Sequence, residues 1–294
     1  MTKYFKVAEH LFSLTLPDSS DLWDRLDNFA PFETEAGDVL FGLEMVDRFP
    51  KPEASEPVYV VPGTSGEPRT DLYRCGDDWC FELSTVTGSP VSVRILADKD
   101  FRKASLCCAQ DDRIRLFAIN NAAMLMFAFS TVGLGTLEMH ASVVVNDNKA
   151  YLFLAKSGTG KSTHSRMWLE NIPGSYLLND DNPAVRVFDD GRIIVYGTPW
   201  SGKTPCYKNK AVPAGAFVKI QRSSENKLTR RGTIEAYVDI FSSSSGLKSD
   251  HQMADKLHST IEKIVLSKIS YVLDCRPDAE AAIVCHSGLT GNEE

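Results

Sequence analysis

Apolar and polar residues alternate in short stretches over the first third of the chain. Every second residue from Phe12 to Leu16 is apolar, which is the period of a half-buried strand. Further short apolar runs stand between clusters of Gly, Pro and Ser, namely DVLFGLEM, PVYVV and VSVRIL. One early helix is predicted over residues 20–29, because apolar residues recur there at helical spacing behind a Ser or Asp cap. We therefore expect residues 1–105 to form a separate, strand-rich N-terminal domain.

A longer apolar pattern opens the remaining region, residues 106–294. Residues 113–130 are apolar nearly all round, which predicts a helix capped by Asp111 or Asp112 and buried in this larger domain. HASVVV and AYLFLA predict two strands joined as a hairpin at NDNK, and later strands are expected in YLL, AVRVF, RIIVY, AGAFVKIQ and SYVLD. Loops are expected at SSENKLTRRG and FSSSSGLKSD. Further helices are expected in three places: up to about Leu169, over about 250–267 and after Pro277.

Composition narrows the choice of partners. The 294-residue chain carries a formal net charge of −7, which argues against broad nucleic-acid binding, because that needs a basic face. The first 18 residues lack the long apolar core of a secretory signal, and the most apolar stretch, Ala122–Gly135, is too short and interrupted to span a bilayer. The seven cysteines include no C-x-x-C pair, so we expect no zinc site and reduced thiols in a cytoplasmic protein. The oligomeric state stays open.

The segment SGTGKST follows the predicted strand AYLFLA and precedes a predicted helix. Its glycines let the backbone curl so that amide N–H groups point inward at a helix N-terminus, which suits a polyphosphate. Lys161 would reach the β- and γ-phosphates of a nucleotide, and the Ser162 hydroxyl would ligate Mg²⁺. The motif G-x-x-x-x-G-K-[ST] has glycine where this chain has Ala155, a residue that is tolerated there if its φ is negative. The alternative is a chance glycine-rich turn. The nucleotide-binding residues predicted from this loop are Ser157, Gly158, Thr159, Gly160, Lys161, Ser162 and Thr163.

Two adjacent aspartates follow the apolar strand YLL. Of the four Asp-Asp pairs in the chain, only Asp180-Asp181 comes after a buried strand close to the loop, as in the metal-binding strand of phosphate-loop enzymes. The alternative is a solvated turn. One helix and one strand fit between Lys161 and Asp180, so we expect AYLFLA and YLLND to be adjacent and parallel. The hairpin at 184–196, indicated by Asp190-Gly191, should continue a sheet that is mixed.

His140, the loop and Asp180-Asp181 stand in the same order as in the catalytic domain of HPr kinase/phosphorylase, which this region resembles. SGTGKST with NDD is also similar to phosphoenolpyruvate carboxykinase, which shares that fold. YGTPWSGK is similar to a segment of HPr-kinase-like proteins in bacterial peptide-modification gene clusters. The resemblance covers about Leu116–Ile220 and, more loosely, the chain to about residue 286. It implies an α/β fold, with a mixed-sheet P-loop domain of the HPr kinase C-terminal or phosphoenolpyruvate carboxykinase type and a strand-rich N-terminal lobe.

The activity that the resemblance implies is transfer of the γ-phosphoryl group of ATP, with Mg²⁺, to a serine hydroxyl. Asp180 would be the catalytic base, His140 its neighbour, and Asp181 a metal or water ligand beside Ser162. Two features depart from HPr kinases: Thr163 stands where they usually carry an acid, and the segment that recruits HPr is not recognisable. We therefore expect an unidentified serine-bearing protein, peptide or small molecule as the acceptor. The further metal and substrate residues of phosphoenolpyruvate carboxykinase have no evident counterparts.

Several residues keep two interpretations. His140 either belongs to this site or is a hydrogen-bonded core residue, and Lys203 either contacts phosphate or acceptor or is a solvated loop charge. Trp200 is expected to pack, with pocket lining as the alternative, and His164 is expected at the surface. The competing function is a nucleotide-binding regulatory or partner protein without turnover, for which the missing loop glycine and the missing acid are the indications.

Overall fold

The computed structural model describes residues 1–18, 21–48, 57–61, 68–202, 204–267 and 269–291. It shows an α/β protein with two mixed sheets. The chain divides into two compact units, one made of Met1–Thr131 with Leu247–His251 and the other of Val132–Gly246 with Gln252–Glu294. We expected the division between residues 105 and 106, so the boundary lies one long helix later than the sequence suggested.

The first unit is built on a sheet that, within the described residues, has nine strands in the order β3-β1-β2-β4-β9-β8-β7-β6-β5. The strands are β1 (Thr2–Val7), β2 (His10–Thr15), β3 (Glu33–Thr34), β4 (Phe41–Met45), β5 (Tyr59–Val61), β6 (Arg69–Cys75), β7 (Asp78–Ser84), β8 (Val93–Ala97) and β9 (Lys103–Cys108). The helix predicted over 20–29 is instead two short 3₁₀ segments, η1 (Asp21–Arg25) and η2 (Ala30–Phe32). Its apolar residues are buried as expected, so the pattern identified the core but not the type of helix.

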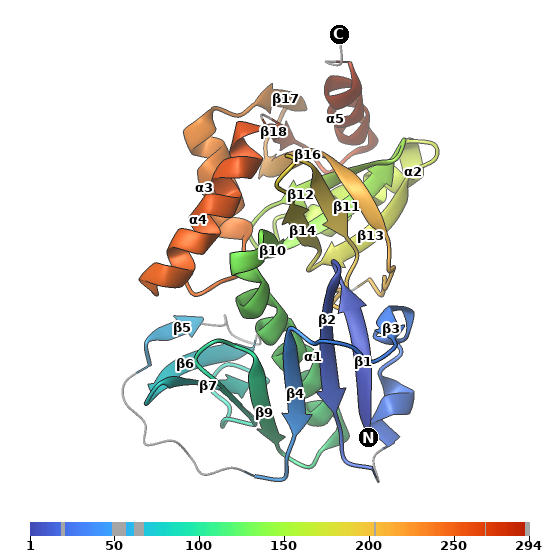
Figure 1. The fold of residues 1–294 in the computed structure, drawn as a ribbon. Helices are drawn as coiled ribbons and strands as arrows, with labels where there is room; N and C mark the ends of the chain where they lie inside the picture. Colours follow the sequence, from blue (N-terminus) through green and yellow to red (C-terminus); the bar gives the residue numbers. More distant parts are fainter. Residues whose placement is uncertain (19–20, 49–56, 62–67, 203, 268, 292–294) are drawn as a thin grey trace. The chain divides into compact units, whose positions relative to one another are not determined.

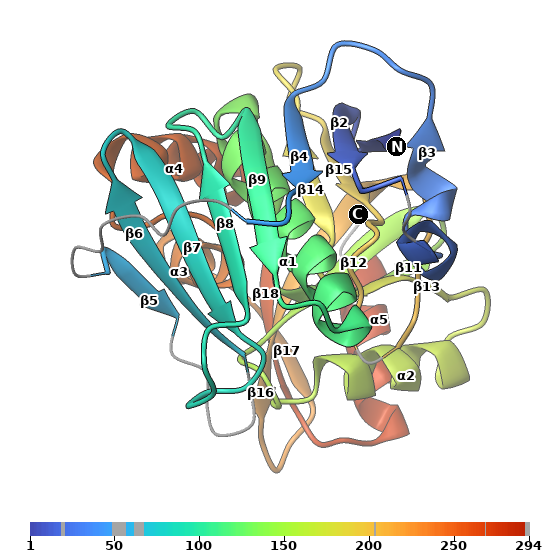
Figure 2. The same cartoon turned by 90° about the horizontal axis from the view of Figure 1, so that it is seen from below.

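Helix α1 (Asp112–Thr131) belongs to the first unit, because it packs against β4, β8 and β9 (Figure 2). Our assignment of this helix to the larger domain was wrong. Its cap is Asp111, whose carboxylate accepts hydrogen bonds from the amides of Arg113 and Ile114. In the part of the chain that the structure describes, one helical stretch, Asp112–Leu134, has the length and composition of a membrane span, but more than half of its most apolar part is buried inside the protein.

The second unit holds a sheet in the order β10-β14-β15-β16-β12-β11-β13, to which β18 adds beside β16 and β17 beside β18 (Figure 1). The strands are β10 (Thr136–Glu138), β11 (Ala141–Asn146), β12 (Lys149–Leu154), β13 (Tyr176–Asp181), β14 (Ala184–Val187), β15 (Ile193–Tyr196), β16 (Ala211–Arg222), β17 (Lys227–Arg230) and β18 (Ser270–Cys275). The helices are α2 (Lys161–Asn171), α3 (Thr233–Ser243), α4 (His251–Leu266) and α5 (Ala279–Thr290), and the 3₁₀ segment η3 (Val132–Leu134) precedes β10. Strand β17 lies where we predicted a loop, and α3 was not predicted.

The predicted hairpin at NDNK is confirmed as β11–β12, and its two turn residues, Asp147 and Asn148, both have positive φ. Our expectation that β12 and β13 are adjacent was wrong, because β11 lies between them and pairs antiparallel with both. The start of β11 therefore lies at the same edge as the ends of β12 and β13. The hairpin β14–β15 is confirmed, and it joins the sheet beyond β16 rather than beside β13.

Helices cover both faces of this sheet. Trp168 of α2 and Ala281 of α5 are fully buried against Phe153 of β12 and Val218 of β16. The opposite side of β16 faces α3, since Lys219 pairs with Asp239 of that helix. The edge where β12, β13 and β16 end is left for the loops that follow them.

Candidate functional site

The glycine-rich loop between β12 and α2 is curled rather than extended. Gly158 has φ 73° and Gly160 has φ 126°, both in the left-handed region that favours glycine. Ala155 is not among the described residues with positive φ, so alanine fits where the motif has glycine. The Arg222 side chain of β16 donates to the carbonyl oxygens of Gly158 at 2.7 Å and Thr159 at 3.2 Å. These two bonds fix the curl of the loop against the neighbouring strand.

Lys161, the first residue of α2, points into the protein and is only 8% exposed. Its Nζ lies 2.6 Å from Nε2 of His140 and donates to the Ala155 carbonyl oxygen at 3.2 Å. Burial lowers the pKa of Lys161, the charges of Asp181 and Asp180 raise it, and Lys219 lowers it. A pocket of about 500 Å³ beside the loop is lined by further cations, among them Lys219. Cations gathered in this way repel one another, and a bound polyanion would remove that cost.

His140 lies directly before β11 and joins Lys161 to Asp181. Its Nδ1 is 3.0 Å from Oδ1 of Asp181. The tautomer with a proton on Nδ1 donates to Asp181 and leaves Nε2 free to accept from Lys161. The backbone N–H of His140 donates to the carbonyl oxygen of Ser243 at 2.7 Å, which anchors the residue. We expected His140 beside Asp180, but the structure pairs it with Asp181, because successive residues of β13 point to opposite faces.

Asp180 points to the α2 side of the sheet. Its Oδ1 accepts a hydrogen bond from Ser142 at 2.8 Å, and Ser142 lies 2.6 Å from the hydroxyl of Ser165 in α2. Its Oδ2 is buried and has no hydrogen-bond partner within the described residues. A buried polar atom without a partner is uncommon and calls for an explanation such as a missing ion or ligand. Ser142 was not predicted, although it is the one hydroxyl in the apolar run HASVVV.

Asn179 shapes the end of β13. Its side chain accepts hydrogen bonds from the amides of Asp181 and Asn182, both at 2.9 Å, and donates to the Trp200 carbonyl oxygen at 3.0 Å. The bond to Trp200 fixes the segment after β15 beside the end of β13, where the two aspartates stand. Gly202 comes so near that a Cβ there would lie 2.9 Å from the carbonyl oxygen of Asp180. Trp200 is buried, which fits the packing role predicted for it. Lys203, the predicted contact to phosphate or acceptor, lies outside the described residues.

Glu138, at the end of β10, is a buried carboxyl group that the sequence analysis missed. Burial raises its pKa to about 7, a hydrogen bond from Ser245 lowers it, and the charge of Asp181 raises it. Its Oε1 has no hydrogen-bond partner in the part of the chain that the structure describes. Because Glu138 and His140 are two residues apart at the end of a strand, an acidic residue at this spacing was the available signal.

We expect the stability of the protein to depend on pH through Glu138. The pKa of Glu138 is about 7 in the folded protein, above its ordinary value of 4.5. Below about pH 4.5 the carboxyl group is protonated in both the folded and the unfolded protein, so its burial costs no ionisation free energy. As the pH rises from 4.5 towards and through 7, the unfolded protein lowers its free energy by ionising this group, and the protein loses up to about 3 kcal/mol of stability. Glu138→Gln should therefore raise the free energy of unfolding at pH 8 by up to about 3 kcal/mol and change it little at pH 4.5.

Urea denaturation of both proteins at the two pH values measures this effect. Glu262→Gln, a change at an exposed position of α4, serves as the control and should shift stability by less than about 0.5 kcal/mol at either pH. Equal effects of Glu138→Gln at both pH values would contradict the prediction.

The other predicted loop residues and His164 differ in exposure. Ser157 and Ser162 are exposed, while Thr163 is partly buried at the start of α2. His164 is buried, so our surface assignment was wrong. Its Nε2 accepts a hydrogen bond from Trp168 at 3.1 Å, and burial lowers its pKa to about 4. It is therefore a neutral core histidine, placed by the helical spacing of the residues that pack on β12.

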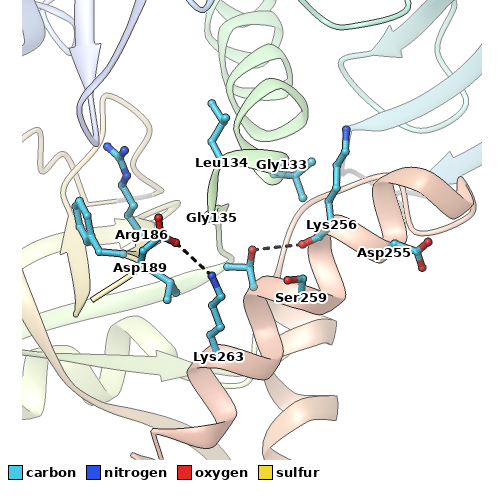
Figure 3. A pocket seen from close by; sticks show the side chains of 13 residues that line it. Gly133, Leu134, Gly135, Arg186, Asp189, Asp255, Lys256, Ser259 and Lys263 are labelled. Carbon is cyan, nitrogen blue, oxygen red and sulfur yellow. Dashed lines mark hydrogen bonds and ion pairs between the residues drawn. The ribbon is translucent and has the colours of Figure 1, made fainter. Parts of the chain in front are cut away.

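A pocket of about 540 Å³ lies elsewhere in the second unit (Figure 3). Arg186 and Asp189 contribute to it from the β14–β15 hairpin, and Lys256 and Lys263 from α4. Lys263 pairs with Asp189 at 3.7 Å, and both are exposed. None of the residues predicted for the site lines this pocket, so its size alone does not make it the functional site.

No family model matches the chain, and a search of curated proteins finds no significant relative. The geometry of the loop edge therefore carries the functional argument. At that edge the end of the curled loop, a buried lysine, a histidine and Asp181 are joined by hydrogen-bond contacts, and Asp180 follows on the other face of the same strand, bonded to Ser142.

Proposed function

We propose that the chain is a Mg²⁺-dependent kinase that transfers the γ-phosphoryl group of ATP to a hydroxyl of a serine-bearing protein, peptide or small molecule. The observation that carries the proposal is the continuous contact from Lys161 through His140 to Asp181 at the open end of the sheet. In the proposal, Lys161 is the cation that binds phosphate and Asp181 the carboxylate that accepts the proton, and they lie on either side of one imidazole. Phosphoryl transfer is catalysed mainly by positioning and electrostatic stabilisation, to which both groups would contribute.

The loop supplies the phosphate site. Backbone N–H groups at the start of α2 and the positive end of its dipole attract polyphosphate oxygens. Lys161 now donates to His140 and to the Ala155 carbonyl oxygen. A bound γ-phosphate is a stronger acceptor than either, because its oxygens are negatively charged whereas the imidazole and the carbonyl group are neutral.

Asp181 is the better placed base. Its side chain is 33% exposed and is oriented by the Nδ1–H of His140, whereas Asp180 is 5% exposed. In the proposed step the acceptor oxygen bonds to the γ-phosphorus, and the bond from that phosphorus to the oxygen that bridges the β- and γ-phosphates breaks. ADP leaves with the electron pair of that bond, and the hydroxyl proton passes late to Asp181. This assignment reverses the roles that the resemblance implied for the two aspartates.

The residues at the site fit a Mg²⁺ ion bound with the nucleotide. Within the described residues no three Asp, Glu, His or Cys side chains gather closely enough to hold a metal alone. Mg²⁺ at nucleotide sites usually takes only one or two carboxylates and completes its shell with phosphates and water. The Oδ2 atom of Asp180 lacks a partner, so Asp180 and Ser162 would hold the ion, directly or through water. When bound, it would neutralise charge on the phosphates.

The resemblance to HPr kinase and phosphoenolpyruvate carboxykinase supports this proposal less than the site does. In its favour, the sheet is mixed, as we expected of that fold. The separation of β12 from β13 by β11 differs from the arrangement that we expected of that fold. The proposal therefore rests on the contacts at the loop.

A nucleotide-binding partner protein without turnover is the second candidate. Two observations favour it: Lys161 already has two acceptors within the protein, and Asp180 is closed off from solvent. Such a closed arrangement would bind nucleotide without bringing Asp180 to the metal that transfer needs.

Incubation with γ-labelled ATP and Mg²⁺ tests both candidates. We expect ADP release, and label transfer to a library of serine-containing peptides or to a hydroxylated small-molecule pool, with both signals lost when EDTA removes the metal. Calorimetric ATP binding without any ADP release would favour the partner protein. Absence of both binding and turnover would overturn the proposal.

A further inference from the structure

A pocket of about 400 Å³ also adjoins the loop, between α2 and the ends of β16 and β18. Its volume falls within the roughly 300–1,000 Å³ of small-molecule sites. It is lined by Thr163, His164 and Met167 from α2, by Ile220 from β16, and by Arg276 and Pro277 after β18.

The topology makes this the natural place for the rest of a ligand whose phosphates occupy the loop. β12, β16 and β18 are parallel neighbours, so their carboxyl ends meet at one edge. Ligands of open α/β sheets bind outside the carboxyl ends of the strands. Gly158, Thr159 and Gly160 belong to the loop and also line this pocket. One extended molecule can therefore occupy the loop and the pocket together.

We propose that this pocket holds the nucleoside end of the bound nucleotide by packing and does not read the base through hydrogen bonds, so that purine nucleoside triphosphates bind alike. This inference rests on the proposed function, because it needs a nucleotide in the loop, and it adds which nucleotides the site accepts.

The strongest donors on the lining are already committed within the protein. Arg276 donates to Asp278 at 2.7 Å, to the Ser224 carbonyl oxygen at 3.0 Å and to Glu280. Its backbone N–H donates to the Asn226 side chain at 2.9 Å. A guanidinium held by two carboxylates and a carbonyl turns to the edge of a base only by giving up those bonds.

Three further nitrogen-bearing groups of the lining also have partners within the protein. Arg222 donates to the carbonyl oxygens of Gly158 and Thr159, and the Ser223 amide donates to the Cys275 carbonyl oxygen at 3.0 Å. The Nε2 atom of His164 accepts from Trp168 at 3.1 Å. Burial keeps this histidine neutral, with its pKa lowered to about 4.

The hydroxyl groups on the lining do not select between purines. Thr163 and Ser223 line the pocket, the Ser223 hydroxyl already accepts from the Glu225 amide at 3.2 Å, and a hydroxyl rotates to donate or to accept. It can therefore serve either the 6-amino group of adenine or the 6-oxo group of guanine. Sites built to hydrogen-bond one group reject an analogue by about 10⁴–10⁵-fold, while apolar pockets discriminate far less. We expect the affinities for ATP and GTP to lie within about fivefold of each other.

Calorimetric titration of the whole chain with ATP, GTP and inorganic triphosphate, each with Mg²⁺, tests the inference. Met167→Trp fills the pocket and should weaken ATP and GTP by at least about tenfold while leaving triphosphate affinity unchanged. Leu169→Trp is the matched control, since Leu169 is an exposed residue of the same helix, and it should bind all three as the wild type does.

The outcomes separate this inference from the proposed function. A preference for ATP over GTP of more than about fiftyfold, or unchanged ATP binding in Met167→Trp, would overturn the pocket inference and leave the phosphate site intact. Failure of the wild type to bind any of the three would overturn both. If Met167→Trp loses triphosphate as well, crosslinking of 8-azido-ATP to the wild type decides: label on the peptides with Met167 or Pro277 supports the pocket, and label elsewhere overturns it.

Discussion

Replacing Lys161 by methionine is expected to lower phosphoryl transfer by about 10²–10³-fold and to weaken ATP binding strongly. Lys161 is the buried cation at the mouth of the loop, and it lies 2.6 Å from His140. Methionine keeps much of the length of the chain but supplies no charge to the phosphates. Calorimetry and the kcat/KM for ATP measure the two effects.

The fold should survive this change. Burial lowers the pKa of Lys161, so removing the charge takes away a desolvation cost together with the hydrogen bonds, and the free energy of unfolding should change little. Arg166→Met is the control, because Arg166 is an exposed cation of the helix that Lys161 begins; it should retain binding within a few-fold. Full ATP affinity in Lys161→Met would show that the loop is not a phosphate site.

Asp181→Asn is expected to reduce transfer by about 10²–10⁴-fold with ATP affinity little changed. Asparagine preserves the size of the side chain and can still accept from His140, but it cannot take up the proton of the acceptor hydroxyl. Asp180→Asn should instead raise the Mg²⁺ concentration needed for half-maximal activity. Transfer rates at saturating ATP, measured across a Mg²⁺ titration, distinguish the two variants.

The pair of variants also decides between two assignments of the base. The contact between Asp181 and His140 predicts that Asp181→Asn carries the loss of transfer. If Asp180→Asn lost transfer at every Mg²⁺ concentration and Asp181→Asn kept it, the first aspartate would be the base, as the resemblance implied.

The local pattern predicted most elements of the second unit but not their order in the sheet. The hairpin at NDNK, the curl of the glycine-rich loop and the hairpin at Asp190-Gly191 were confirmed, because each depends on a few consecutive residues. The insertion of β11 between β12 and β13 depends on which strand edges bury the most apolar surface, and a single sequence does not encode that choice locally. The same limit misplaced α1, whose apolar residues fit either unit.

The candidate site shows the same division. Lys161 and the two aspartates were predicted from a motif and a strand end, and the structure brings them to one edge. Ser142 and Glu138 were missed because their side-chain partners, Asp180 and Ser245, are far away in the sequence. Which aspartate faces His140 was assigned wrongly, since the strand pattern shows that neighbours alternate but not which face is which.

The turn at Asp147 and Asn148 sets the length of the hairpin whose far end carries His140 and Ala155. Pairing runs without a break from Asn146 opposite Lys149 to Ala141 opposite Leu154. A slip of this register by one residue would send every following side chain of one strand to the other face. Relatives of this protein are therefore expected to keep Asn, Asp or Gly at both turn positions, since both have positive φ, and an engineered loop graft that forces another register there would disable an edge of the sheet that it never touches.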